Sequence, residues 1–128
     1  MHRETLAIKL VDLDSCREIT PEEVPPSEFA GTMYYACPEV KTGNFFSPVS
    51  QDMYAMGILL LSIFFKGKVP DLDLGNSMEV IDSHGVSKVF REHKPEVSTM
   101  TVKLIQSLVA KKAQKRPDIV DVVHLLSD

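Results

Sequence analysis

The hydrophobic pattern of the chain centres on one long apolar run. After its first two residues, the range 51–65 is apolar at every position except Gly57 and Ser62. A helix that is apolar on all sides needs burial on all sides. The run reaches only about 20 Å at about 1.5 Å per residue, short of the roughly 30 Å of a bilayer core. The pattern therefore predicts a central core helix, with Asp52 or Ser50 as its N-cap, and no membrane span.

Weaker patterns precede this run. Residues 7–11 form a short, apolar and β-branched stretch, which is typical of a strand. The range 15–28 is polar and contains Pro21, Pro25 and Pro26. Because proline lacks an amide donor and fixes φ, this range is predicted to be a loop.

Helical patterns follow the apolar run. Residues 76–83 predict a short helix that Gly85 ends, and the ranges 98–111 and 118–126 carry apolar stripes at helical spacing. The stripe of 98–111 consists of Thr101, Leu104, Ile105, Leu108 and Val109, opposite Lys103 and Gln106, and the stripe of 118–126 consists of Ile119, Val122, Val123 and Leu126. The chain is thus predicted to be mainly α-helical, with one short β segment near its start.

Composition narrows the classes of function. The 44% of hydrophobic and 25% of charged residues are typical of a globular protein. With 14 basic and 18 acidic side chains, the net charge of −4 argues against a nucleic-acid-binding protein. Cys16 and Cys37 lack metal-ligand spacing and the histidines are scattered, so we expect reduced thiols and no metal centre in this pattern. No apolar leader begins the chain, so we expect a cytoplasmic protein, although the basic residues at 111–116 also suit nuclear import.

Four motifs follow one another in a characteristic order. They are Asp12-Leu13-Asp14, the segment Gly31–Val40, the segment Asp52–Gly57 and Arg116-Pro117. Together they resemble the DFG, GT-x-x-Y-x-APE, D-x-W-x-x-G and closing R-P motifs of the C-terminal lobe of eukaryotic protein kinases. The resemblance implies a partial kinase domain over 1–128, the mainly α part of an α+β parent fold. Its activation segment would be 12–39 and its helical lobe 40–128.

This resemblance implies roles for two residues at the phosphoryl-transfer site. Asp12 would hold Mg²⁺ against the phosphates of ATP, because phosphoryl transfer relies on positioning and charge neutralisation. Without the other motifs, we would prefer to interpret Asp12 as a turn residue that ends a strand. Thr32 matches the threonine that lines the substrate-hydroxyl site of Ser/Thr kinases, so the resemblance favours serine and threonine substrates.

Three further residues take structural roles by resemblance. Glu39 and Arg116 would form a buried ion pair that fastens the activation segment to the helical lobe, and losing one partner of such a pair costs about 3–5 kcal/mol. Asp52 would tether the backbone of the catalytic loop, or would act as a simple N-cap.

The sequence departs from the kinase pattern at Asp14, where the motif has glycine. Glycine permits backbone conformations that a side chain disfavours. A second carboxylate beside Asp12 also raises the proton affinity of both, unless a cation lies between them. Either Asp14 assists Mg²⁺ or the site is impaired. Thr20 and Ser27 in the activation segment are candidate phosphorylation sites, or else solvated loop hydroxyls.

The catalytic loop of the family is missing from these 128 residues. His2-Arg3-Glu4 is not that loop, because the asparagine expected five positions after the acid is replaced by Lys9. The glycine-rich loop, the strand lysine and the other N-lobe elements are missing too. We therefore expect the C-lobe portion of a Ser/Thr protein kinase that is inactive alone, acts on a protein substrate and needs its N-lobe as partner, with Mg and ATP bound only in the complete domain. The alternatives are a pseudokinase that scaffolds protein partners and an unrelated helical adaptor.

Overall fold

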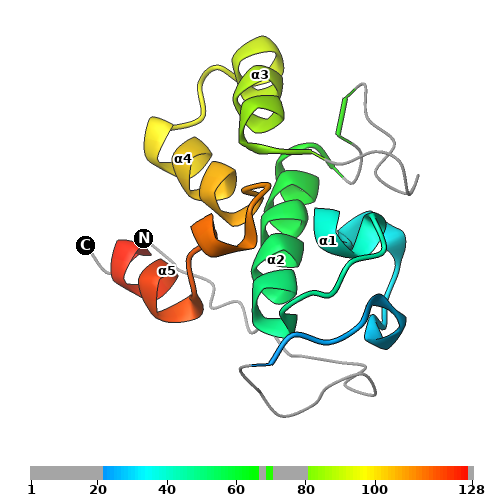
Figure 1. Ribbon diagram of the computed structural model, residues 1–128. Coiled ribbons are helices and arrows are strands. Elements are labelled where there is room, and N and C mark those ends of the chain that lie inside the picture. Colours follow the sequence, from blue (N-terminus) through cyan, green and yellow to red (C-terminus); the bar gives the residue numbers. More distant parts are fainter. Residues whose placement is uncertain (1–21, 67–68, 71–80, 127–128) are drawn as a thin grey trace, which may run out of the picture.

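Helix α2 is the axis around which the other helices are arranged (Figure 1). The computed structural model describes residues 22–66, 69–70 and 81–126. Helix α1 lies on one side of α2, and α4 and α5 lie on the other (Figure 1). The helices are α1 (Pro38–Lys41), α2 (Pro48–Phe64), α3 (Ser83–His93), α4 (Thr99–Leu108) and α5 (Ile119–Leu126), with the short 3₁₀ helices η2 (Pro26–Glu28), η3 (Met33–Tyr35) and η4 (Ala113–Lys115).

The predicted mainly helical architecture is confirmed. Over the described ranges the only β structure is an isolated bridge between Val24 and Phe46. The predicted strand at 7–11 lies outside the described residues. The predicted loop at 15–28 is described from residue 22 onward, and there it contains the turn of η2.

Helix α2 begins earlier than the sequence pattern predicted. Its N-cap is Ser47, whose Oγ accepts a hydrogen bond from the amide of Ser50 at 3.4 Å. Pro48 follows as the first helical residue, where its missing amide is harmless. The prediction of Asp52 or Ser50 as the N-cap is therefore wrong, and Asp52 lies inside the helix.

Burial of α2 is one-sided among the described residues. Tyr54, Ile58 and Leu61 are buried in the core, whereas Leu59 and Ile63 remain 49% and 65% exposed. The burial on every side that the apolar pattern predicts is thus incomplete in the part of the chain that the structure describes.

Helix α3 corrects the end of the predicted helix at 76–83, whose residues 76–80 lie outside the described residues. Residues 81–82 are not helical, and Gly85 lies inside α3 instead of ending a helix. The reason is the cap: Asp82 Oδ1 accepts a hydrogen bond from the Gly85 amide at 2.9 Å, so the helix begins just where the pattern suggested an end. Its buried residues follow helical spacing and are Val86, Val89 and Phe90.

Helix α4 begins as predicted, at the N-cap Ser98, but ends at Leu108, three residues before the predicted end. The prediction that Gln106 lies on the face opposite the apolar stripe and points away from the core is wrong. Its Nε2 donates to the Ser83 carbonyl at 2.9 Å, and Ser83 Oγ donates to the Gln106 carbonyl at 2.7 Å. These two hydrogen bonds join the start of α3 to the end of α4.

Helix α5 has the predicted extent but not the predicted face. Asp118 Oδ1 accepts from the Asp121 amide at 2.9 Å, which caps its first turn. Val122 is buried, but Ile119 and Val123 are 53% and 52% exposed. Helix α5 touches the core through a small cluster around Met53, Leu108 and Val122, and Val122 is the member of the predicted stripe that makes this contact among the side chains that the structure describes.

Candidate functional site

The centre of the candidate site is Arg116, in the turn between η4 and α5. Its Nε donates to the Ala110 carbonyl at 2.8 Å, and its Nη2 donates to the Lys111 carbonyl at 3.3 Å. Its own amide donates to the Ala113 carbonyl at 3.1 Å. The backbone that follows α4 therefore fixes the direction in which the guanidinium points.

The guanidinium of Arg116 points at Glu39 in the first turn of α1. Nη1 donates to Oε2 at 2.8 Å and Nη2 to Oε1 at 2.6 Å, across 77 positions of sequence. The side chain of Arg116 is fully buried and that of Glu39 is 20% exposed. Two parallel, charge-assisted hydrogen bonds give this pair a fixed geometry as well as energy. The structure thus brings together the two residues that the sequence suggested as an ion pair.

The electrostatics keep this pair charged. Burial alone would raise the pKa of the Glu39 carboxyl, but the hydrogen bonds and positive charge of Arg116 outweigh it and lower the pKa below its ordinary value. The Glu39 carboxyl therefore stays ionised at neutral pH, and its charge compensates the desolvation of the Arg116 guanidinium.

Tyr54 of α2 forms the base of the site. The guanidinium carbon of Arg116 lies 5.2 Å from the centroid of the Tyr54 ring, a cation–π contact. The Tyr54 hydroxyl donates to the Ile81 carbonyl at 3.0 Å, and burial raises its pKa. The tyrosine therefore stays protonated and links the ion pair to the chain just before α3.

Gln51 of α2 fixes the segment ahead of α1 from a second direction. Its Oε1 accepts from the Cys37 amide at 2.7 Å, and its Nε2 donates to the Tyr35 carbonyl at 2.9 Å. Sequence analysis missed Gln51, and the available signal was a polar residue next to the start of an otherwise apolar helix. The Cys37 thiol is buried beside this contact, and burial raises its pKa to about 11. We refer to Cys37, Glu39, Gln51, Tyr54 and Arg116 as the anchor cluster.

The other predicted site residues lie apart from the anchor cluster or outside the described residues. Thr32 is exposed just before η3, and its side chain caps no amide there. Ser27 is exposed in η2. Asp52 is an exposed residue of α2. Neighbouring atoms still remove part of the water around its carboxyl, and this desolvation raises the pKa of Asp52. Asp12, Asp14 and Thr20 lie outside the described residues.

Over residues 22–66, 69–70 and 81–126, no three His, Cys, Asp or Glu side chains gather in a way that could hold a metal ion. No helix in those same ranges has the length and apolarity to cross a membrane.

Residues 1–125 match the family described as the protein kinase domain. The chain belongs to the protein kinase family. In this kinase chain, the anchor cluster joins α1 and the segment ahead of it to α2 and to the turn before α5.

Comparison with individual kinases gives similar relatives of two kinds. The serine/threonine-protein kinases PSK1 and PSK2 of Saccharomyces cerevisiae are 32% and 30% identical over 115 residues, which is 90% of this chain. The tyrosine-protein kinase TXK of Mus musculus is 26% identical over 123 residues, or 94% of this chain. The chain spans only 8% and 10% of the two yeast kinases and 23% of the mouse kinase.

Proposed function

We propose that this chain is the C-lobe portion of a Ser/Thr protein kinase, which transfers the γ-phosphate of ATP to serine or threonine hydroxyls of a protein substrate. Residues 12–39 form its activation segment and residues 40–128 its helical lobe. The family match carries this proposal. The yeast relatives, which are serine/threonine kinases by name, and Thr32 support the choice of substrate class.

The anchor cluster supports the proposed division into segment and lobe. Glu39 ends the proposed activation segment, and its partner Arg116 belongs to the far end of the helical lobe. Gln51 adds two hydrogen bonds to the backbone of the same segment from α2. A segment held at its end in this way can present Thr32, which is exposed, to a substrate hydroxyl.

The proposal that Mg²⁺ and ATP bind in the complete domain rests on residues identified in the sequence. Mg²⁺ prefers oxygen ligands and usually binds through one or two carboxylates together with the substrate phosphates. The carboxylates of Asp12 and Asp14 are donors of this kind. When bound, the ion would neutralise charge on the phosphates during transfer. Because the 128 residues include no catalytic loop and no N-lobe elements, we propose that they transfer phosphate only within a complete kinase domain.

Phosphoryl transfer to defined acceptors tests this function. The longest natural protein that contains this chain is incubated with MgATP and peptides whose acceptor is serine, threonine or tyrosine. The proposal predicts labelling of the serine and threonine peptides, and loss of that labelling in Asp12→Asn. Glu92→Gln, which neutralises an exposed carboxylate of α3, is the control and keeps the activity. Unchanged transfer by Asp12→Asn, or labelling of tyrosine alone, contradicts the proposal.

A pseudokinase is the second candidate, and Asp14 favours it. If Asp14 impairs the site, Asp14→Gly creates or raises transfer and wild type binds MgATP poorly. If Asp14 assists Mg²⁺, the same substitution weakens Mg²⁺-dependent ATP binding. A protein that neither binds MgATP nor gains activity in Asp14→Gly is better described as a scaffold for protein partners.

A further inference from the structure

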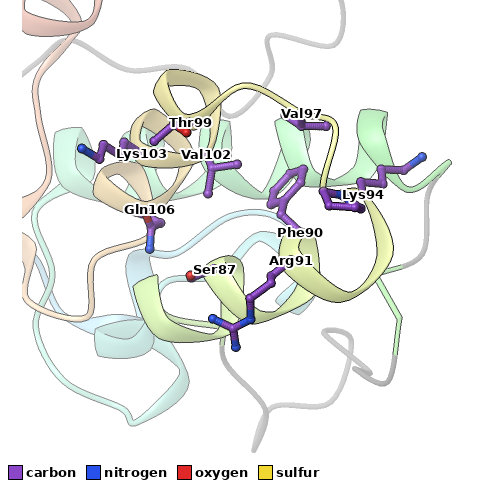
Figure 2. A pocket seen from close by; sticks show the side chains of 10 residues that line it. Ser87, Phe90, Arg91, Lys94, Val97, Thr99, Val102, Lys103 and Gln106 are labelled. Atoms are coloured by element: carbon purple, nitrogen blue, oxygen red, sulfur yellow. The ribbon is translucent and has the colours of Figure 1, made fainter.

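A hollow of about 370 Å³ lies between α3 and α4, on the surface formed by these two helices and the turn that joins them (Figure 2). Its frame is fixed at one end by the paired hydrogen bonds between Ser83 and Gln106. At the other end the turn closes with a hydrogen bond from the Val97 amide to the Lys94 carbonyl at 3.2 Å. The hollow is therefore a preformed feature of the helix pair.

The floor of the hollow is apolar. Phe90 and Val102 lie between the two helices in Figure 2, and Val97 lies on the turn that joins them. Phe90 is only 2% exposed, and its ring packs edge-on against Phe64 with 5.4 Å between centroids. A floor of this kind suits one apolar side chain.

The rim of the hollow is positively charged. Arg91, Lys94 and Lys103 surround the apolar floor from different sides (Figure 2), and the lining contains no carboxylate. Lys94 is partly engaged, since its Nζ lies 5.7 Å from the centroid of the Phe65 ring. Within the described ranges, Arg91 and Lys103 form no ion pair. Three cations on the rim of one hollow stand out in a chain whose net charge is −4.

We propose that this hollow binds an acidic segment of a partner protein. An apolar side chain of the partner enters between Phe90 and Val102, and carboxylates on either side of it meet Arg91 and Lys103. The hydroxyl of Ser87, which also lines the hollow, is available for the partner's backbone. This binding is separate from phosphoryl transfer and does not depend on the chain being an active kinase.

The charge pattern favours a protein over other anionic partners. Recognition of an anionic membrane surface typically uses four to eight basic residues, and nucleic-acid binding uses an extended basic face. Here the cations are few and enclose an apolar floor, which matches a mixed acidic and apolar peptide.

Peptide binding tests the proposal directly. The probe is a fluorescein-labelled peptide with one leucine flanked on each side by three glutamates, and the protein is the longest natural one that contains this chain. Fluorescence anisotropy is expected to show saturable binding that weakens as NaCl increases. Arg91→Glu combined with Lys103→Glu is expected to weaken binding at least about tenfold, because two attractions become repulsions. A peptide with serine in place of leucine is also expected to bind more weakly.

Lys88→Glu is the matched control, because Lys88 is an exposed residue of α3 that does not line the hollow. Because it reverses one charge on the same helix, its effect is compared with that of Arg91→Glu alone, and it is expected to change the affinity less than about twofold. Absence of binding overturns the proposal, as does an equal effect of the rim variants and Lys88→Glu. If the serine peptide binds as tightly as the leucine peptide, the claim that an apolar side chain enters the hollow is overturned. Binding to phosphatidylserine vesicles instead of the peptide would assign the rim to a membrane and also overturn it.

Discussion

One buried guanidinium, that of Arg116, joins two parts of this kinase chain that are far apart in sequence. It contacts the carbonyls of Ala110 and Lys111 on one side and the carboxylate of Glu39 on the other. A buried charge that loses its partner keeps its desolvation penalty without compensation. The pair therefore stabilises one arrangement of the segment ahead of α1, because alternatives would separate the charges.

The lowered pKa of Glu39 gives a pH prediction. Since the folded pKa lies below the ordinary value of 4.5, the carboxylate stabilises the folded state above that pH, and this contribution is lost as the pH falls through the folded pKa. We expect the free energy of unfolding to decrease as the pH falls below the ordinary pKa of 4.5. Glu39→Gln should flatten this part of the profile, measured by urea unfolding of the longest natural protein that contains this chain at each pH. An unchanged pH profile in Glu39→Gln contradicts the assignment.

The Cys37 thiol should be unreactive in the folded protein. It is fully buried, and burial raises its pKa to about 11, so little of the reactive thiolate is present at neutral pH. Iodoacetamide labelling, read by mass spectrometry of the peptide that carries Cys37, should proceed only as fast as the protein opens. Full labelling in denaturant is the control. Rapid labelling under native conditions would show that the anchor cluster is open.

At the residue scale, the sequence predicted the ion pair between two side chains but not the hydrogen bonds from a side chain to a distant backbone. Glu39 and Arg116 could be paired because both belong to motifs of the family resemblance. The role of Gln51 could not be predicted, because it depends on where the backbone of Tyr35 and Cys37 lies. No local sequence pattern shows that position. The placement of Asp12, Asp14 and Thr20 stays a prediction.

At the scale of elements, the packing of α2 against the end of α4 depends on Gly57. A methyl group added there would lie 2.6 Å from Val109 Cγ1 and 2.9 Å from Leu108 Cβ. Gly57→Ala should therefore destabilise the protein by about 1–2 kcal/mol, because overpacking outweighs the gain in helix propensity. Urea unfolding of the longest natural protein that contains this chain measures this change.

Gly85→Ala is the comparison for that substitution. In α3 the added methyl group would lie 3.0 Å from the nearest atom, Ile81 Cγ1, so the crowding is milder and the propensity gain offsets more of it. An effect of Gly57→Ala no larger than that of Gly85→Ala would show that α2 and α4 are packed less closely than described.

The helices were predictable where apolar spacing and caps agreed. Ser98 and Asp118 mark the starts of α4 and α5, and both starts were found from sequence. The start of α3 was missed because Gly85 resembles a helix terminator, whereas its amide is the group that Asp82 caps. The exposed side of α5 was missed because periodicity shows an apolar face but not how much of it another element covers.

At the scale of the whole molecule, several large apolar side chains are exposed among the described residues. They are Phe45, Leu59, Ile63, Met100, Ile119, Val120 and Val123. Each large apolar side chain left in water forgoes roughly 1.5–3 kcal/mol of burial. We therefore expect the 128-residue chain alone to self-associate or to melt without a sharp, reversible transition.

Replacing one of these side chains tests that expectation. Ile63 is 65% exposed, so Ile63→Lys should reduce self-association in sedimentation measurements with little loss of helical content. Ile58→Lys is the contrasting variant, since Ile58 is fully buried and its replacement should unfold the chain. A sharp, reversible and concentration-independent melt of the unchanged chain would contradict the expectation.

The central claim is that Glu39 and Arg116 together hold the segment ahead of α1 on the helical lobe. Hydrogen exchange of residues 33–41, measured for Glu39→Gln, Arg116→Met and the double variant, tests it most directly, with Lys115→Met as an exposed control. We predict that each single variant lowers the free energy of opening by about 3–5 kcal/mol and that the double variant lowers it by much less than the sum. Unchanged exchange in the single variants, or effects that simply add, would contradict the claim.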